Sequence, residues 1–295
     1  MMSDPPATID GSATHGASRS IPTRRIPLSQ IVLRGPQIDD LLEPAMEPNS
    51  DRIRPFDASW NGPDDRLISM GTMVRAADGG PLRLHRPVPG HENGVYPSWK
   101  AGTSLRWEGV GQLWRIIAAE VAHDVVGIWT ESARFELPFA GRRSYTTDLE
   151  LRMADGSTTF IEVKRDERDL EDPEYARMLS ATKEVCRRCG MGFEVVVRDD
   201  IFESRIHRQN AEFFASRAFG TVSDAHLDRF EGHRRRSGGQ TTYGELAEAL
   251  EPGRPVIGKA VVQTLTVRRR VEIDLTRRLT DAVPVRMHLA PGNAK

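Results

Sequence analysis

The sequence predicts an α/β protein in which a mixed β-sheet flanked by helices precedes a C-terminal helical domain. Three observations predict this class. Residues 104–122 place apolar side chains at helical spacing. Two strands, SYTTDLELRM and STTFIEVKR, follow with a short turn between them. A helix bounded by Pro173 and Gly190 then leads into GFEVVVR, a continuous apolar run typical of a buried strand.

The chain of 295 residues has room for two modest domains. Residues 1–50 are rich in Pro, Ser, Thr and Asp, and we expect them to be disordered because they cannot bury enough apolar surface. The remaining segments are a lead-in at 51–103 that packs on the core, the core domain at 104–203, the helical domain at 204–285 and a tail at 286–295.

Composition excludes several classes of protein. Hydrophobic residues make up 38% and charged residues 28%, and no apolar run approaches the ~18 residues of a membrane-spanning helix. The N-terminus lacks the pattern of a secretory signal, so we expect a cytoplasmic protein with no membrane contact.

The sequence does not predict a cysteine or histidine metal site. Cys186 and Cys189 cannot form a disulfide framework, and no second pair completes a zinc site, so we interpret them as small apolar residues on a buried helix face. The eight histidines show no paired ligand spacing. We interpret His123 and His207 as structural residues.

The register of the central hairpin decides whether its acidic residues can share a metal ion. A two-residue turn at Asp155 and Gly156 would place Leu149 opposite Glu162 and mix apolar with charged residues on one face. A three-residue Ala154-Asp155-Gly156 loop, with Gly156 in the left-handed conformation, instead places Leu149 opposite Ile161 and Asp148 opposite Glu162. The second register makes both faces consistent.

In this register Asp148, Glu162 and Lys164 project from one side of the sheet, with opposed Cβ atoms ~4.5–5.5 Å apart. Two carboxylates so close repel each other unless a cation lies between them, which favours a Mg²⁺ or Mn²⁺ site. Lys164 is placed to orient or deprotonate a water, or to neutralise charge on a phosphate. The alternative is the solvent face of an amphipathic hairpin that also carries Glu150. Phe160 on the same face favours a central hairpin.

The segment YTTDLELRMADGSTTFIEVK resembles the core of the TnsA-like endonucleases, the PD-(D/E)XK subunits of multi-component transposons. The resemblance rests on a tyrosine-x-x-aspartate strand and an E-V-K strand beside a short turn, and it extends over roughly residues 95–285. It implies a restriction-endonuclease-like core and a Mg²⁺-dependent DNA endonuclease that hydrolyses phosphodiester bonds at transposon ends. It also implies two partners, a DDE-type transposase and an AAA-type ATPase regulator.

The chain departs from the family pattern at two positions. The family carries an acidic residue on the preceding helix, where this chain has Gln112, with Glu108 one turn earlier. Glu108 as a metal ligand, Gln112 as an alternative ligand through its carbonyl oxygen, and Glu120 under another alignment all remain open, and we favour Glu108. Thr147 replaces the proline that commonly precedes the catalytic aspartate, which removes no ligand.

The C-terminal region is the candidate for DNA contact. Between Arg205 and Arg278 there are fourteen Lys and Arg against nine Asp and Glu. Short helices are expected, one with a Thr242/Glu245 capping box. The segment PVIGKAVVQTLTVRRRVEIDL then predicts a helix leading into a strand, which suits a winged helix. Such a domain could present these residues to DNA: Lys259, Gln263, Arg268, Arg269 and Arg270. A small helical bundle with a charged surface is the alternative.

Two other functions compete with a transposon endonuclease. One is a stand-alone restriction or phage-type nuclease with the same chemistry. The other is a catalytically silent DNA-binding or scaffold subunit that keeps the fold. The sequence contains no Walker-type phosphate loop, GxSxG elbow or HExxH helix. ATP hydrolysis, if the system needs it, must therefore come from another protein.

Overall fold

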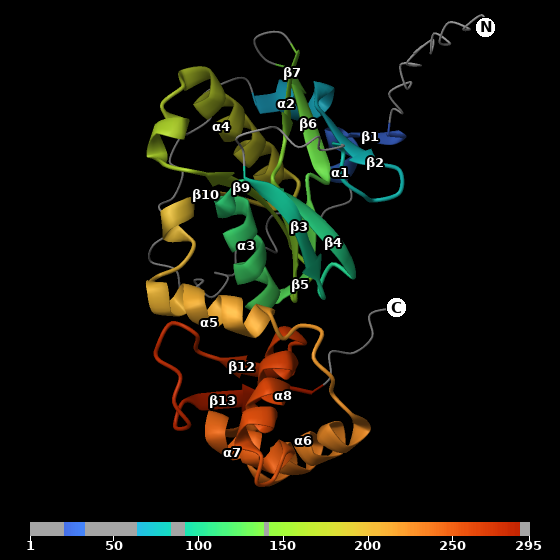
Figure 1. Cartoon of the computed structure of the whole chain (residues 1–295). Coiled ribbons are helices and arrows are strands. Elements are labelled where there is room, and N and C mark those ends of the chain that lie inside the picture. The colour runs from blue at the N-terminus through green and yellow to red at the C-terminus, as the bar shows by residue number, and fades with distance from the viewer. Residues whose placement is uncertain (1–20, 33–63, 84–91, 139–141, 290–295) are drawn as a thin grey trace, which may run out of the picture.

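The computed structural model describes residues 21–32, 64–83, 92–138 and 142–289, and shows a mixed α/β protein (Figure 1). Its upper part holds two four-stranded sheets, whose strand orders are β10-β9-β8-β5 and β1-β2-β6-β7. The strands of the first sheet are β5 (Val125–Thr130), β8 (Leu149–Met153), β9 (Thr158–Lys164) and β10 (Gly192–Val197). Those of the second are β1 (Thr23–Pro27), β2 (Thr72–Ala76), β6 (Ala133–Pro138) and β7 (Arg142–Thr146).

The predicted hairpin, β8 and β9, lies in the middle of the first sheet and is covered on both faces. Ile161 packs in one apolar cluster with Ile116 of α3 (Val110–Val121). Phe160 packs in another with Leu179 of α4 (Pro173–Arg188). Phe160 is fully buried and Glu162 is 4% exposed, so the interpretation of a solvent-facing hairpin is wrong.

The predicted register of the hairpin is confirmed. Leu149 lies opposite Ile161, and the backbone N–H of Met153 donates to the carbonyl of Ser157 at 2.9 Å across a three-residue loop. Gly156 has φ +89°, the left-handed conformation that this loop requires. Asp148 precedes the first paired residue of β8, on the side of the sheet that carries Glu162.

Two segments are each divided between the two sheets. The predicted strand SYTTDLELRM forms β7 and β8, and residues 128–138 form the end of β5 and β6. Backbone bonds continue across the break, from Glu131 N–H to Asp148 O at 2.9 Å and from Thr147 N–H to Ala133 O at 3.1 Å. Glu131, at φ +48°, marks the irregular step, as a β-bulge does. Asp148 therefore lies where the paired strands pass from one sheet to the other.

The predicted helix at 104–122 begins later than expected. Thr103–Glu108 is a strand, β4, paired antiparallel with β3 (Asn93–Ser98), and α3 starts at Val110. Gly109 separates the two elements at φ +78°, a conformation that interrupts a helix. The predicted lead-in at 51–103 contributes two strands, β2 and β3.

The N-terminal segment is only partly described. Thr23–Pro27 pairs with β2, and α1 (Leu28–Val32) packs beside α2 (Asp64–Met70), so disorder is wrong for residues 21–32. The rest of the predicted disordered segment lies outside the described residues. At the other end, β13 (Pro284–Met287) extends into the predicted tail, of which 290–295 also lie outside the described part.

The C-terminal unit follows the predicted series of helices. It consists of α5 (Arg205–Ala215), α6 (Asp224–Arg236), β11 (Gln240–Thr242), α7 (Tyr243–Leu250), α8 (Pro255–Val267), β12 (Val271–Ile273) and β13. The capping box of Thr242 and Glu245 is confirmed at the start of α7. The three strands form a sheet in the order β11-β13-β12. In the described part of the chain, no helix has the length and apolar character needed to cross a bilayer.

The two units share a core. Helix α5 lies across the junction in Figure 1 and contacts both α3 and α8. Ile117 and Val121 of α3 belong to the same apolar cluster as Phe214 of α5 and Leu265 of α8. Because the cluster is continuous, burial of α8 depends on α5 as well as on the helices of its own unit.

Candidate active site

The structure brings Asp148 and Glu162 together, as the register predicts. The backbone N–H of Val163 donates to Oδ2 of Asp148 at 2.8 Å, so the aspartate is held against β9 beside Glu162. Among the charged groups around Asp148, Glu162 has the largest effect on the pKa of its carboxyl, which it raises. Two carboxylates thus lie side by side at the centre of the sheet, on the face that α4 covers.

Three donors surround the carboxylate of Glu162. Lys164 Nζ lies 2.5 Å from Oε1, the hydroxyl of Tyr175 donates to Oε1 at 2.5 Å, and the hydroxyl of Tyr145 donates to Oε2. The lysine ammonium also lies 4.4 Å from the ring centroid of Tyr175. The sequence alone does not indicate the role of either tyrosine, although Tyr145 belongs to the strand motif and Tyr175 follows the N-terminal cap of α4.

Burial and charge both act on Asp148. Desolvation raises the pKa of its carboxyl well above the usual range, and the neighbouring Glu162 carboxylate raises it further. The Val163 N–H and Lys164 oppose this shift only in part. Burial raises the pKa of the Tyr145 hydroxyl well above its usual range, and the carboxylates of Glu162 and Asp148 raise it further. Tyr145 therefore stays a neutral hydrogen-bond donor. The folded site thus favours the protonated, neutral form of the Asp148 carboxyl.

This shift predicts a pH-dependent stability. Folded Asp148 retains a proton at pH values where an unfolded aspartate, with a pKa of about 3.9, has lost it. The free energy of unfolding therefore falls as pH rises from the unfolded pKa through the folded one. We expect Asp148→Asn to gain stability over the wild type as pH rises from about 4 to about 8 in EDTA, measured by urea unfolding. A difference between the two proteins that does not change with pH would contradict this account.

The three candidates for the fourth position lie in different surroundings. Glu108 is an exposed residue at the end of β4, not on the helix. Gln112 is 5% exposed, and its Oε1 accepts the Glu108 backbone N–H at 2.6 Å while its Nε2 donates to the Asp148 carbonyl at 3.3 Å. Glu120 accepts from Ser98 Oγ and the Trp99 N–H, both at 2.6 Å, eight residues or about 12 Å further along α3. Gln112 is thus the candidate that touches Asp148.

Another buried acidic residue, Glu150, lies on the same face of the strand as Asp148. Glu150 is 6% exposed and receives two hydrogen bonds from Arg75 of β2, at 2.6 and 3.0 Å, and one from Ser132. The guanidinium of Arg75 lies 5.7 Å from the centroid of the Phe160 ring. Because Arg75 compensates it, Glu150 connects the two sheets instead of supplying a third carboxylate to the Asp148 site.

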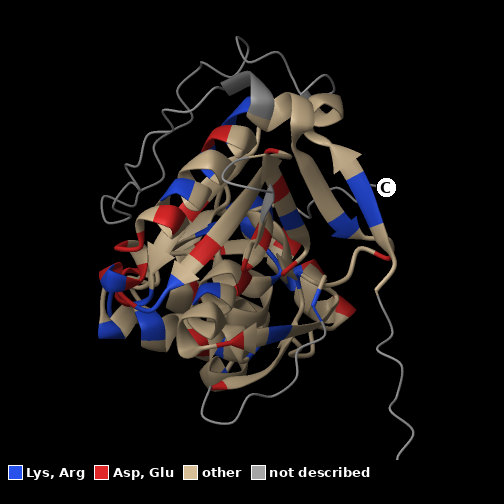
Figure 2. Ribbon diagram, turned by 90° about the horizontal axis from the view of Figure 1, so that it is seen from above, with Lys and Arg blue, Asp and Glu red and all other residues tan. Residues whose placement is uncertain are grey.

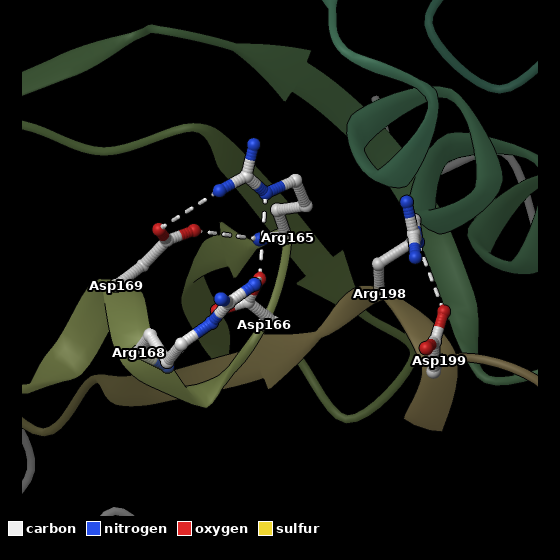
Figure 3. A network of polar contacts seen from close by, with 6 residues as sticks. All are labelled: Arg165, Asp166, Arg168, Asp169, Arg198 and Asp199. Carbon is white, nitrogen blue, oxygen red and sulfur yellow. Dashed lines mark hydrogen bonds and ion pairs between the residues drawn. The ribbon is translucent and has the colours of Figure 1, made fainter.

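The strand ends next to Lys164 carry an exposed charged network (Figure 3). Arg165 contacts Asp166 and Asp169, Arg168 lies 2.8 Å from Asp166, and after β10 Arg198 lies 2.9 Å from Asp199. Each guanidinium has an acidic partner, so the network is balanced in charge. Figure 2 shows basic and acidic residues similarly interspersed over the ribbon in that view.

The five residues predicted to contact DNA make contacts within the protein. Gln263 is 3% exposed and donates to Tyr243 at 2.7 Å, and Lys259 lies 2.5 Å from Asp281. The three arginines that follow α8 are also engaged: Arg268 donates to Gly220 O at 2.8 Å, Arg269 donates to His123 O at 2.7 Å, and Arg270 pairs with Glu231. Helix α8 is buried along its second half, so its sequence does not lie open as a recognition surface.

The donor set at Asp148 and Glu162 fits a hard divalent cation. Both carboxylates supply the oxygen ligands that Mg²⁺ prefers, and Mg²⁺ commonly binds one or two protein carboxylates while keeping several waters. Comparisons with known proteins add no relative, because no family model and no curated protein matches the chain.

Proposed function

We propose that the protein is a Mg²⁺- or Mn²⁺-dependent DNA endonuclease. The observation that carries this proposal is the pair of neighbouring carboxylates, Asp148 and Glu162, beside Lys164 at the centre of a sheet. A bound divalent ion would lower the pKa of a water and polarise the scissile phosphate. The resemblance of the hairpin sequence to TnsA-like endonucleases supports DNA as the substrate.

The chain's own residues have distinct roles in this proposal. Asp148 and Glu162 hold the ion, and Lys164 offers a cation to the charge that develops on the phosphate. Tyr145 and Tyr175 fix the orientation of Glu162 through their hydroxyl groups. Gln112 donates a hydrogen bond to the Asp148 carbonyl and is a positioning residue. It replaces Glu108, the residue favoured from the sequence, as the candidate for the fourth position of the site.

The finer fold assignments are part of the same proposal. A helix-flanked sheet with its acidic pair on the central hairpin supports a restriction-endonuclease-like core. The order α6, β11, α7, α8, β12, β13 supports a winged-helix-like C-terminal unit. Because α5 covers α8, DNA contact by this unit would use other residues, and the exposed Arg235 and Arg236 at the end of α6 offer one such surface.

The resemblance also carries the proposed partners, a DDE-type transposase and an AAA-type ATPase regulator, and cleavage at transposon ends. The stand-alone nuclease differs only in needing neither partner. The test of the shared chemistry is nicking of supercoiled DNA by the purified protein in Mg²⁺, Mn²⁺ or EDTA, with Mn²⁺ binding measured in parallel by calorimetry. Nicking that persists in EDTA, or failure to bind Mn²⁺, would overturn the metal-dependent mechanism.

The two candidates for the fourth position predict different results. Gln112→Ala removes the bridge to Asp148, and we expect about a tenfold loss of nicking, equivalent to about 1.4 kcal/mol in the transition state. Glu108→Ala changes an exposed side chain and should stay within about twofold of the wild type. Initial nicking rates at saturating Mn²⁺ distinguish the two variants. The reverse order of effects would restore Glu108 as the fourth catalytic residue.

A further inference from the structure

A second group of metal-ligand side chains lies at the junction of the two units, away from the acidic pair. It comprises His123, between α3 and β5, Glu272 in β12, and His288, directly after β13. Each offers one ligand atom, and these atoms all lie within 4.8 Å of one another. Among the residues that the structure describes, this is the one such group of three or more.

The fold places these residues together through the β12-β13 hairpin. Glu272 lies opposite Arg286, and His288 continues the strand two residues later, so Glu272 and His288 share a face. Nε2 of His288 lies 3.0 Å from Oε2 of Glu272. On the same side, the ring of His288 stacks on that of His123 with centroids 4.1 Å apart. Arg269 holds the His123 backbone by donating to its carbonyl at 2.7 Å.

The His123 ring does not make the hydrogen bonds expected of a structural histidine. Its Nδ1 atom is buried and accepts or donates no hydrogen bond within the described residues. By contrast, Nδ1 of His207 accepts the Glu203 backbone N–H at 3.3 Å, which confirms a structural role there. A buried ring nitrogen with no partner is costly, and a metal ion would satisfy it.

We propose that His123, Glu272 and His288 bind a zinc-class divalent ion that fastens the C-terminal unit to the end of α3. Two imidazoles and one carboxylate are a ligand set that zinc accepts with a fourth position left to water. Mg²⁺ prefers oxygen ligands to imidazole nitrogen, so this site and the acidic pair select different ions.

Binding requires small movements of the three side chains, each of which is partly buried. A tetrahedral ion with bonds of about 2.0 Å needs its ligand atoms about 3.3 Å apart, so the three side chains must draw inward and the stacked rings must tilt. His288 would exchange its contact with Glu272 for the ion. Glu272 would also release Arg286, now 3.4 Å away, whose side chain is 63% exposed. An exposed ion pair contributes little, so its loss opposes binding only weakly.

The test is calorimetric titration of the full chain with Zn²⁺, carried out on Asp148→Asn so that the acidic pair contributes less. We expect one Zn²⁺ per chain and an affinity at least about a hundredfold lower after His123→Ala or His288→Ala, because loss of even a residue supporting a ligand costs 10- to 100-fold. His233→Ala is the matched control, since that histidine contacts Thr241 elsewhere in the C-terminal unit.

A second readout separates binding from damage to the fold. Zn²⁺ should raise the melting temperature of the parent and of His233→Ala but not that of His288→Ala, whose side chain is only partly buried. Circular dichroism checks that each variant is folded. Absence of Zn²⁺ binding by the parent, or equal affinity in the parent and both ligand variants, would overturn the proposal. Neither result would count for or against the proposed nuclease activity at the acidic pair.

Discussion

Asp148→Asn is expected to lower metal-dependent nicking by at least about a thousandfold, which corresponds to about 4 kcal/mol of transition-state stabilisation. The amide keeps the size of the side chain and an oxygen to accept the Val163 N–H. It removes one of the two negative charges that would hold the ion. The loss should therefore appear in both the nicking rate and the affinity for Mn²⁺.

The matched control is Asp155→Asn, at the opposite end of the same hairpin. Asp155 is exposed in the turn, where its Oδ1 accepts the Ser157 N–H at 2.8 Å. This variant should nick and bind Mn²⁺ as the wild type does. If nicking needs protein partners, calorimetry with Mn²⁺ still separates the two variants. Wild-type Mn²⁺ affinity and nicking in Asp148→Asn would exclude Asp148 from the site, whereas a lack of Mn²⁺ binding and of metal-dependent nicking in both proteins would favour a silent scaffold.

Arg75→Met is expected to lower the free energy of unfolding by about 3–5 kcal/mol, because it leaves the buried carboxylate of Glu150 without its compensating charge. The Glu150 side chain is 7% exposed, and Arg75 supplies two of its hydrogen bonds. Methionine retains the apolar stem against Phe160, so the lost charge dominates the effect. Urea unfolding at neutral pH measures it.

Two further variants test this explanation. Arg75→Met/Glu150→Met replaces both charges with apolar side chains and should recover most of the loss, since a buried pair contributes little net stability. Arg168→Met removes an exposed partner of Asp166 and should cost less than about 1 kcal/mol. A double variant as unstable as Arg75→Met would show that packing, not the uncompensated charge, is responsible.

The sequence predicted the parts of the fold that depend on local patterns. The three-residue loop, the pairing of Leu149 with Ile161 and the boundaries of α4 each follow from residues close together in the chain. Residues 104–108 were predicted as part of a helix, because the helical pattern of the residues that follow extends to them. That pattern does not show their pairing with the distant strand Asn93–Ser98. Gly109 is the signal that could have separated them.

Side-chain partners from distant elements limited the prediction of the site. A basic run such as Arg268 to Arg270 resembles a solvated surface, yet backbone carbonyls and Glu231 occupy these guanidinium groups. Likewise, spacing along a helix cannot show that Tyr175 reaches Glu162, because α4 and β9 meet only in the folded protein. Asp148 and Lys164 were predictable because the register of one hairpin sets their positions relative to Glu162.

Because β7 and β8 belong to different sheets, the carboxylates of Asp148 and Glu162 are attached to different parts of the fold. Glu162 belongs to a strand of one sheet, whereas Asp148 lies on the connection that leads into the other. A rotation of one sheet against the other would therefore change the spacing of the acidic pair without unfolding either sheet. In the proposed mechanism, the affinity of the acidic pair for a cation would therefore depend on the angle between the two sheets.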